Sequence, residues 1–227
     1  MLFRSLEHGG PVLAPFGVGI AVFVMIGAVI DIAERTMIMR VPFHAALQRA
    51  LGLPRSAWGT AFAHFGIGMT LLGIVSVTAW GVERIVEVKP GETLEISHYR
   101  ATFNGLFQRP GPNYRDVVGL FTIHRASGEY LGNMEPSRRT FPSRDEVTTE
   151  AALMTRGFSQ LYLSLGDPGK DGSVAVRLYY KPHVLMIWFG AGFMFIGGAL
   201  SLSDRRLRVG APRPAKVKLA AAAQPAE

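Results

Sequence analysis

The chain has 227 residues, a formal net charge of +7 and no cysteine. Without cysteine it contains no disulfide, no thiolate metal site and no thiol nucleophile. The positive charge does not indicate a nucleic-acid partner, because residues 81–182 hold 13 basic and 12 acidic residues and are nearly neutral. The basic excess lies instead in two short segments that flank long apolar stretches.

The first apolar stretch, residues 11–30, is uncharged and of membrane-crossing length. We expect it to form a retained transmembrane helix within residues 1–33, preceded by a short outer amino terminus. It superficially resembles a signal peptide, but its apolar run exceeds the usual signal core. No clear cleavage site precedes Asp31, Glu34 and Arg35 either.

Residues 34–55 are predicted to be a cytoplasmic loop, in which the amphipathic residues 43–51 lie along the interface as a short helix. This loop and the tail, residues 204–227, carry the basic excess. Its members are Arg35, Arg40, Arg49, Arg55, Arg205, Arg206, Arg208, Arg213, Lys216 and Lys218. Basic residues favour the cytoplasmic side of a membrane, so the amino terminus and residues 81–182 are predicted to lie outside.

The second apolar stretch, residues 56–80, carries no Asp, Glu, Lys or Arg but contains His64. At about 1.5 Å per residue it covers roughly 35 Å, enough to cross a hydrocarbon core of about 30 Å. Trp58 and Trp80 bracket it, as expected for indole rings at the two interfaces. An ionisable side chain at such a depth indicates a functional site. His64 is the candidate site residue, either as a cofactor ligand or as a packing residue between helices.

Projected on a helix, residues 56–80 show two stripes of small side chains. The first stripe lets another backbone approach closely, and it calls for a helix that three spans are not expected to supply. Its members are Gly59, Ala63, Gly66, Thr70 and Gly73.

In the second stripe, His64 is flanked by Ala61 and Gly68. These small residues leave a flat clearing beside the imidazole, with Phe65 and Met69 at its edge. A planar macrocycle such as haem, ligated through the imidazole, needs such a clearing. Small residues also flank ordinary helix-packing sites, so both interpretations of His64 stay open.

A bis-histidine site needs a second ligand at the depth of His64, which lies roughly 12 Å from the cytoplasmic end of its helix. Thr60 is positioned to accept the other ring N–H and so to fix the tautomer. His8 and His183 lie at the outer ends of their spans, and His44 lies at the cytoplasmic interface. The second ligand is therefore expected from another polypeptide, with His44 as the first internal candidate.

Residues 81–182 contain short β-forming runs separated by regular turn signals, which predicts a small antiparallel barrel or sandwich. The predicted strands are 84–88, 93–96, 99–107, 117–124, 162–165 and 174–180. His98 and His124 are expected in strands, at surface or loop-edge positions rather than as ligands. The Arg138-Arg139 pair and Arg144 are expected on a solvated face, with binding of a carboxylate or of a partner's acidic face as the alternative.

Residues 183–203 form the third predicted transmembrane helix, and a disordered basic tail follows, rich in alanine, proline and lysine. The predicted fold class is therefore a membrane α-helical protein with three transmembrane helices and an inserted small all-β domain.

With these residues located, the chain resembles the carboxy-terminal part of CcmF, the haem lyase component of cytochrome c-type biogenesis, and its NrfE-like relatives. The resemblance runs from about Gly10 to Arg208. The motifs that carry it are Ala63-His64-Phe65-Gly66, Val82-Glu83-Arg84, Lys89-Pro90-Gly91-Glu92, Gly111-Pro112-Asn113-Tyr114, residues 136–142, residues 161–166, residues 176–182, Trp188 and Asp204-Arg205-Arg206.

The resemblance implies a multi-pass protein of the bacterial inner membrane, with residues 81–182 in the periplasm. It implies that haem is taken from the carrier CcmE and that its vinyl groups are joined to the cysteines of an apocytochrome c. It also implies a haem b held in the membrane by two histidines, of which His64 matches the second. The other implied partners are the amino-terminal CcmF part and a CcmH-type thiol-handling protein.

The family's tryptophan-rich motif, its two periplasmic haem-binding histidines and its other membrane histidine are absent from this sequence. The resemblance therefore does not imply catalysis by this chain alone, which corresponds to a natural split subunit or to a truncated reading frame.

Two classes of function follow. The first is a haem-binding component of the lyase. The second is a non-catalytic membrane scaffold whose domain 81–182 binds a maturation partner, with His64 only a packing residue. A transporter fragment is disfavoured, because the other spans contain neither a central charge nor a matching broken helix. A b-type absorption spectrum that is lost on His64→Ala would separate the first class from the second.

Overall fold

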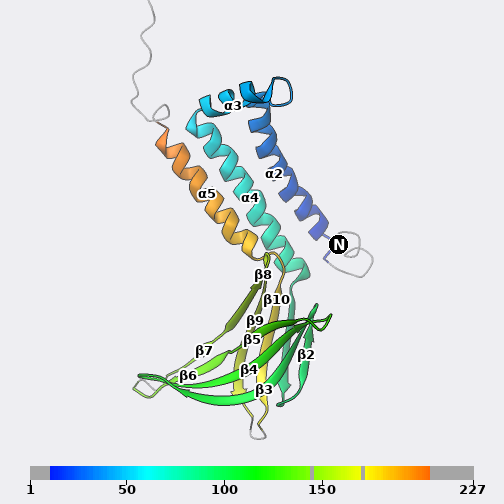
Figure 1. The fold of residues 1–227 in the computed structure, drawn as a ribbon, viewed down its shortest axis with the longest axis vertical. Helices are drawn as coiled ribbons and strands as arrows, with labels where there is room; N and C mark the ends of the chain where they lie inside the picture. Colours follow the sequence, from blue (N-terminus) through cyan, green and yellow to red (C-terminus); the bar gives the residue numbers. More distant parts are fainter. Residues whose placement is uncertain (1–10, 144–145, 170–171, 205–227) are drawn as a thin grey trace, which may run out of the picture.

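The computed structural model of the chain describes residues 11–143, 146–169 and 172–204. It places a layer of helices at one end of the molecule and a β domain at the other (Figure 1). The predicted outer amino terminus before residue 11, Arg144 and the basic tail after residue 204 lie outside the described residues.

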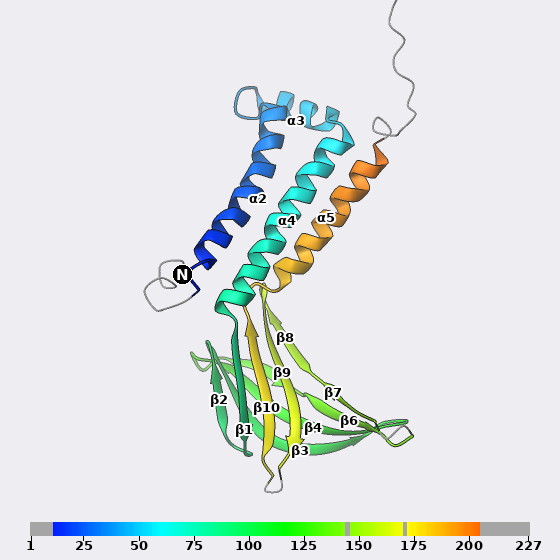
Figure 2. The same ribbon diagram turned by 180° about the vertical axis from the view of Figure 1, so that it is seen from behind.

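Three helices are long and apolar enough to cross a membrane: α2 (Ala14–Thr36), α4 (Arg55–Trp80) and α5 (Leu185–Ser203). The helix predicted at residues 43–51 is confirmed as α3 (Phe43–Gly52), which joins α2 to α4 at the end away from the β domain. α4 packs against both α2 and α5 and lies between them in both ribbon views (Figure 2). The helices therefore form one layer with α4 at its centre.

α2 extends beyond the apolar stretch that the sequence marks. Its last turns contain Asp31 and Arg35, four residues apart, and the Arg35 Nε donates to both carboxylate oxygens at 2.9 Å. Such a pair stabilises a helix terminus in which the apolar pattern has ended. The helix stops at Met37, whose φ of 55° is left-handed.

α4 and α5 approach each other at their glycines. A Cβ on Gly190 would lie 2.5 Å from the carbonyl oxygen of Gly66, and a Cβ on Gly197 would lie 2.6 Å from that of Gly59. The stripe of small residues on α4 thus has its partner within the chain, and the expectation that three spans would not supply that partner is wrong. Gly190 and Gly197 are seven residues apart, so they share one face of α5 and let the two backbones meet.

Asp204, the residue that follows α5, fixes the other end of this helix pair. Its Oδ2 accepts a hydrogen bond from the backbone N–H of Ser56 at 3.0 Å. α4 begins after Pro54 and has no side-chain cap of its own. The carboxylate of Asp204 therefore accepts one of the backbone N–H groups that the first turn of α4 leaves without a partner. Asp204 is buried at this contact.

The β domain consists of two antiparallel sheets, which makes it a sandwich. One sheet has the strand order β1-β10-β9-β8, and the other has the order β2-β3-β4-β6-β7 with β5 paired to β4. The strands are β1 (Val82–Val88), β2 (Thr93–Ile96), β3 (Tyr99–Pro110), β4 (Arg115–Arg125), β5 (Tyr130–Met134), β6 (Ser137–Phe141), β7 (Glu146–Glu150), β8 (Ala152–Arg156), β9 (Ser159–Pro168) and β10 (Val174–Lys181).

The predicted fold class, three membrane-length helices with an inserted small all-β domain, is confirmed. The six predicted strands are present, and β5 to β8 are additional strands that the sequence did not mark. These four strands are short, and β7 has the sequence Glu-Val-Thr-Thr-Glu, in which hydrophobic alternation is weak.

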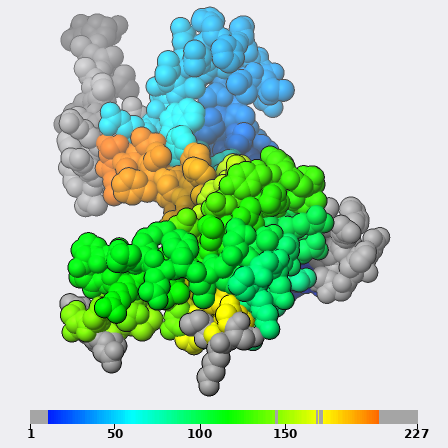
Figure 3. Space-filling view, turned by 60° about the horizontal axis from the view of Figure 1, so that its bottom comes forward, coloured from blue at the N-terminus to red at the C-terminus, as the bar shows by residue number. Residues whose placement is uncertain are grey.

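The core of the sandwich lies between the inner faces of the two sheets. Phe103 and Phe121 stack there with their ring centroids 4.9 Å apart, and both are fully buried with Leu163 and Val176. β3 contains a bulge after Phe103, where Gly105 has a φ of 137° that only glycine adopts readily. The bulge bends the long strands, and their sheet forms the broad green face of the molecule seen in Figure 3.

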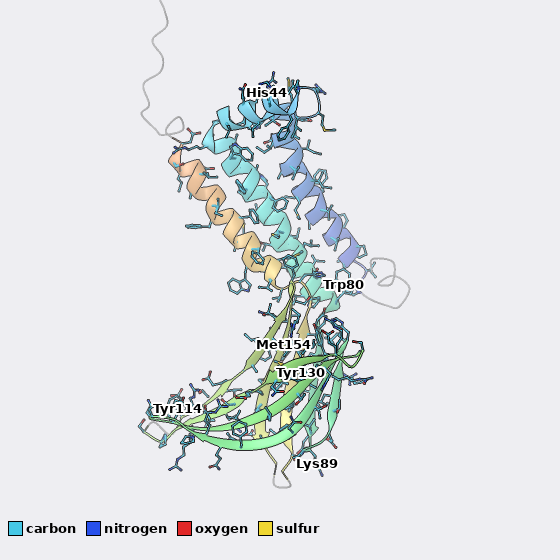
Figure 4. All side chains as sticks on the ribbon, in the orientation of Figure 1. His44, Trp80, Lys89, Tyr114, Tyr130 and Met154 are labelled. Atoms are coloured by element: carbon cyan, nitrogen blue, oxygen red, sulfur yellow. The ribbon has the colours of Figure 1, made fainter. Side chains whose placement is uncertain are left out.

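The β domain joins the helices without a long linker. α4 ends at Trp80 and β1 begins at Val82, whereas β10 ends at Lys181 and α5 begins at Leu185. Figure 4 shows Trp80 at this junction. Phe158, in the turn between β8 and β9, adds a third contact: its carbonyl accepts from the Leu185 N–H at 3.1 Å. Its ring also lies 6.0 Å from that of Phe189 on α5.

Candidate cofactor site in the helical layer

His64 is held on α4 in one defined ring orientation. Its Nδ1 lies 2.9 Å from the backbone carbonyl oxygen of Thr60. A carbonyl can only accept, so Nδ1 is the protonated nitrogen, and in the neutral ring Nε2 carries the available lone pair. The expected tautomer-fixing role of Thr60 is present, but it is performed by the backbone carbonyl. The Thr60 hydroxyl instead donates to the carbonyl of Ser56 at 3.0 Å.

His64 lines a cavity of about 350 Å³ between α2 and α4. The other lining residues are Phe23, Val24, Gly27, Ala28, Asp31, Arg35, Thr60 and Ala61. The imidazole itself is exposed rather than packed within a contact between two of the described helices. The cavity has a volume typical of small-molecule sites and an apolar wall with few polar groups.

Two glycines beside the cavity behave differently. A Cβ on Gly27 would meet no atom within 4 Å, so this face of α2 is open. A Cβ on Gly68 would lie 2.7 Å from the carbonyl oxygen of Ala21 and would also collide with Met25. The clearing expected on both sides of His64 is therefore closed at Gly68 by α2. It is open toward Gly27 and Ala61. Gly27 lies on another helix, and no pattern in the sequence singles it out.

Phe65 does not border this cavity, contrary to the sequence-based expectation. It lies on the α5 side of α4, where its ring contacts Phe193 edge-on at a centroid distance of 5.4 Å. Phe65 lines a second apolar cavity with Trp58, Phe62 and Phe193. The two cavities share the small residues Ala28 on α2 and Ala61 on α4.

The cavity beside His64 contains one ion pair, Asp31 with Arg35, and both side chains are nearly half exposed. The sequence marked Arg35 only as a sign of membrane orientation. Asp31 and Arg35 are four residues apart at the end of the apolar stretch. Because an acid and a base at this spacing pair on a helix surface, the sequence contained a signal that the helix continues through both residues.

The remaining histidines of the described chain lie far from His64. His44 is on α3 at the end of the layer away from the β domain (Figure 4). His98 occupies the exposed turn between β2 and β3 rather than a strand, with Tyr180 4.9 Å away, and His124 lies in β4. His183 has a left-handed φ of 53° just before α5. Within the described residues, no three His, Asp or Glu side chains gather to hold a metal ion.

The Arg138-Arg139 pair is structural. Arg139 donates from Nε and a terminal nitrogen to the buried Asp116, at 3.0 and 3.2 Å, and lies over the Tyr114 ring. This hydrogen bonding raises the pKa of the Arg139 guanidinium. Arg138 pairs with Asp167 on β9 and so connects the two sheets. The expectation of a solvated face is thus only partly met: both arginines are mostly buried and paired with acids, whereas Asp167 is exposed.

The fold defines a membrane protein with a β-sandwich outside its helical layer, and the central helix of that layer carries the exposed His64 beside a cavity. Residues 79–182 match the family described as the CcmF C-terminal β-sandwich. The chain is 54% identical over 211 residues to the cytochrome c-type biogenesis protein CycK of Bradyrhizobium diazoefficiens, which covers 93% of this chain and 32% of that protein. It is 37% identical to CcmF of Escherichia coli over 67% of this chain and 24% of that protein.

The solved structure of a protein titled cytochrome c heme lyase CcmF has the same fold, with a TM-score of 0.59 at 17% identity. The match covers 85% of this chain and 39% of that one. The chain is therefore a CcmF-like carboxy-terminal segment, and its β-sandwich is a member of the CcmF C-terminal family. It spans about a third of the length of the relative CycK.

Proposed function

We propose that this chain is the carboxy-terminal part of a membrane haem lyase for cytochrome c maturation and that His64 supplies one axial ligand of a haem b. The observation that carries this proposal is the hydrogen bond from His64 Nδ1 to the Thr60 carbonyl, beside an open cavity. It leaves Nε2 as the coordinating atom, which is the usual arrangement for a metal-bound histidine. The relatives are cytochrome c biogenesis proteins by name, which agrees with a haem cofactor.

The residues around His64 suit a flat, mostly apolar group. Gly27 and Ala61 leave room beside the imidazole, Phe23 and Val24 provide an apolar wall, and the carbonyl of Thr60 holds the ring orientation. When bound, haem supplies one-electron chemistry, and the protein's part is ligation, burial and orientation. Among the described residues, His44 lies at the end of the layer and His183 just before α5, so we infer that the second ligand would come from another polypeptide.

In this proposal the helical layer spans the bacterial inner membrane. α3 and the basic loop, residues 34–55, face the cytoplasm, and residues 81–182 lie in the periplasm. The exposed Phe43, Leu47 and Leu51 of α3 support its place at the membrane surface. The sandwich is the docking site for the maturation partners: the haem carrier CcmE, a CcmH-type thiol-handling protein and apocytochrome c.

The test uses this chain co-expressed with the amino-terminal two-thirds of the Bradyrhizobium relative. The purified complex should show a b-type absorption spectrum, and His64→Ala should abolish it. His44→Ala is the matched control, because His44 lies at the end of the layer, and it should keep the spectrum. The chain alone should bind no stoichiometric haem, since it provides one imidazole at the required depth among its described residues.

Unchanged haem content in the His64→Ala complex would reject the ligand role. It would leave the alternative of a non-catalytic scaffold, in which the sandwich binds a maturation partner and His64 only packs against a helix.

A further inference from the structure

We propose that Arg35 binds a carboxylate of the haem and thereby fixes its orientation in the cavity, with the carboxylate edge toward α3. This inference rests on the proposed function, because it concerns the same cavity as His64. It assigns a positioning role to a residue that the sequence marked only as a sign of topology.

The first step of the argument is the placement of Arg35. Arg35 and His64 line the same cavity from opposite helices, and Arg35 is the only arginine or lysine among the lining residues. A haem ligated in an apolar cavity brings two carboxylates with it. Carboxylates are costly to bury unless they are paired or reach water.

The second step is the geometry of the guanidinium. The Nε–H of Arg35 donates to both carboxylate oxygens of Asp31, at 2.9 Å each. Its two terminal nitrogens have no hydrogen-bond partner among the described residues, and they form the edge that binds a carboxylate in a bidentate manner. Asp31 thus holds the side chain in place while the binding edge stays available.

The third step is depth. α2 and α4 are antiparallel, with Gly17 next to Val75 and Gly68 next to Ala21 and Met25. This register places His64 opposite residues 27 and 28 of α2. Arg35 then lies about 11 Å closer to the α3 end, at 1.5 Å per residue. A porphyrin radius, a propionate arm and an arginine side chain together span such a distance.

The experiment removes the carboxylate charge from the ligand and the cation from the protein. The co-expressed complex is stripped of haem and titrated with haem or with haem dimethyl ester, whose carboxylates are blocked. The unsubstituted complex should prefer haem by about tenfold, the size expected for one charged hydrogen-bonded pair. Arg35→Gln should bind both ligands equally and should show a lower reduction potential, because a cation near the iron is lost.

Two variants serve as controls. Arg35→Lys keeps the charge and should retain part of the preference for haem, which shows that the site still folds. Arg40→Gln removes an arginine at the same end of the layer, but Arg40 lines a different cavity, so this variant should behave like the unsubstituted complex.

Equal binding of haem and its ester by the unsubstituted complex, or a preference that survives Arg35→Gln, would overturn the assignment. The second result is also expected if Arg35 binds a lipid phosphate instead. Either result leaves the ligand role of His64 standing, provided that His64→Ala still loses haem. Haem retained by His64→Ala would reject the proposed function itself.

Discussion

The role of a single side chain in this molecule depends on which carbonyl or carboxylate it contacts. His64 donates to a carbonyl of its own helix, so its ring is oriented without help from a neighbouring helix. Arg35 and Asp31 are likewise held by their own helix. Gly27 of α2 also lines the cavity, and because glycine has no side chain, the space beside His64 stays open. The cavity is therefore formed by residues of α2 and α4 alone.

Gly27→Leu should lower the affinity of the co-expressed complex for haem by about tenfold or more, because the added side chain occupies the cavity next to His64. The measurement is a haem titration followed by absorbance. Gly19→Leu is the matched control: a Cβ there also meets no atom within 4 Å, but Gly19 does not line the cavity. Equal haem binding by both variants would show that the cavity is not where haem lies.

Tyr99 gives the β domain a dependence on alkaline pH. Burial, followed by the charge of Tyr180, raises the pKa of Tyr99 above its usual value of 10.0. The folded chain therefore holds this proton more tightly than the unfolded chain. The resulting stability is fully present below pH 10 and is lost as the pH rises through the raised pKa.

Tyr99→Phe should accordingly lose less stability above pH 10 than the unsubstituted chain. Thermal unfolding of the full chain in detergent, followed by circular dichroism in steps of pH, measures the difference. Tyr130→Phe removes an exposed tyrosine of the same domain and should follow the unsubstituted chain. If Tyr99→Phe does so too, burial of Tyr99 does not contribute to the alkaline loss.

At the scale of elements, the contact between α4 and α5 determines the arrangement of the layer. Glycines on both helices allow backbone contact, and Asp204 joins the ends of the pair through Ser56. α2 packs on the opposite face of α4 and leaves a cavity that Gly27 of α2 and Ala61 of α4 both line. α4 is thus the element against which the other two are placed.

Gly190→Leu should destabilise the chain by about 1–3 kcal/mol, because a Cβ at this position collides with the backbone of α4. Gly192→Leu, two residues along the same helix, adds the same side chain where a Cβ meets no atom within 4 Å. Unfolding of both variants by denaturant in detergent should separate them. Similar unfolding midpoints would mean that the two helices do not meet at Gly190.

The helices and most of the strands could be predicted from the sequence, since a charge-free stretch of membrane length and a run of β-formers between turns are local signals. Local signals did not predict which helix packs against each face of α4. Gly66 and Gly68 look alike in the sequence, yet one contacts α5 and the other contacts α2. Which small residue leaves a cavity and which one accepts a helix depends on where distant segments pack.

At the scale of the whole molecule, charge is distributed unevenly between the two ends. The basic residues of the described chain that precede α4 lie around α3, whereas the β domain at the opposite end is nearly neutral. Five arginines of its described residues are paired with acids, among them Arg139 with Asp116 and Arg138 with Asp167. A charge difference of this kind orients a membrane protein.

Protease added to spheroplasts should therefore cleave within residues 81–182 and spare the loop near Arg49. The experiment is read with an antibody or tag on each segment, and disrupted cells, in which both segments are accessible, provide the control. Cleavage near Arg49 in intact spheroplasts, with the β domain protected, would reverse the proposed orientation.

The chain leaves the helical layer through β1 and returns to it through β10, and these two strands are hydrogen-bonded neighbours from Val82 opposite Tyr180 to Val88 opposite Val174. Together they form a ribbon that continues directly from α4 and α5. Two strands paired along their length resist bending and twisting better than a single strand would, and Phe158, in the β8–β9 turn of the same sheet, adds a contact with Phe189 of α5. The sandwich thus continues the helix pair through two hydrogen-bonded strands. A slight tilt of α5 against α4 would therefore displace the distal loops, such as the one at Lys89, more than the strand ends near the helices. Conversely, a partner that displaces those loops would change the contact between α4 and α5.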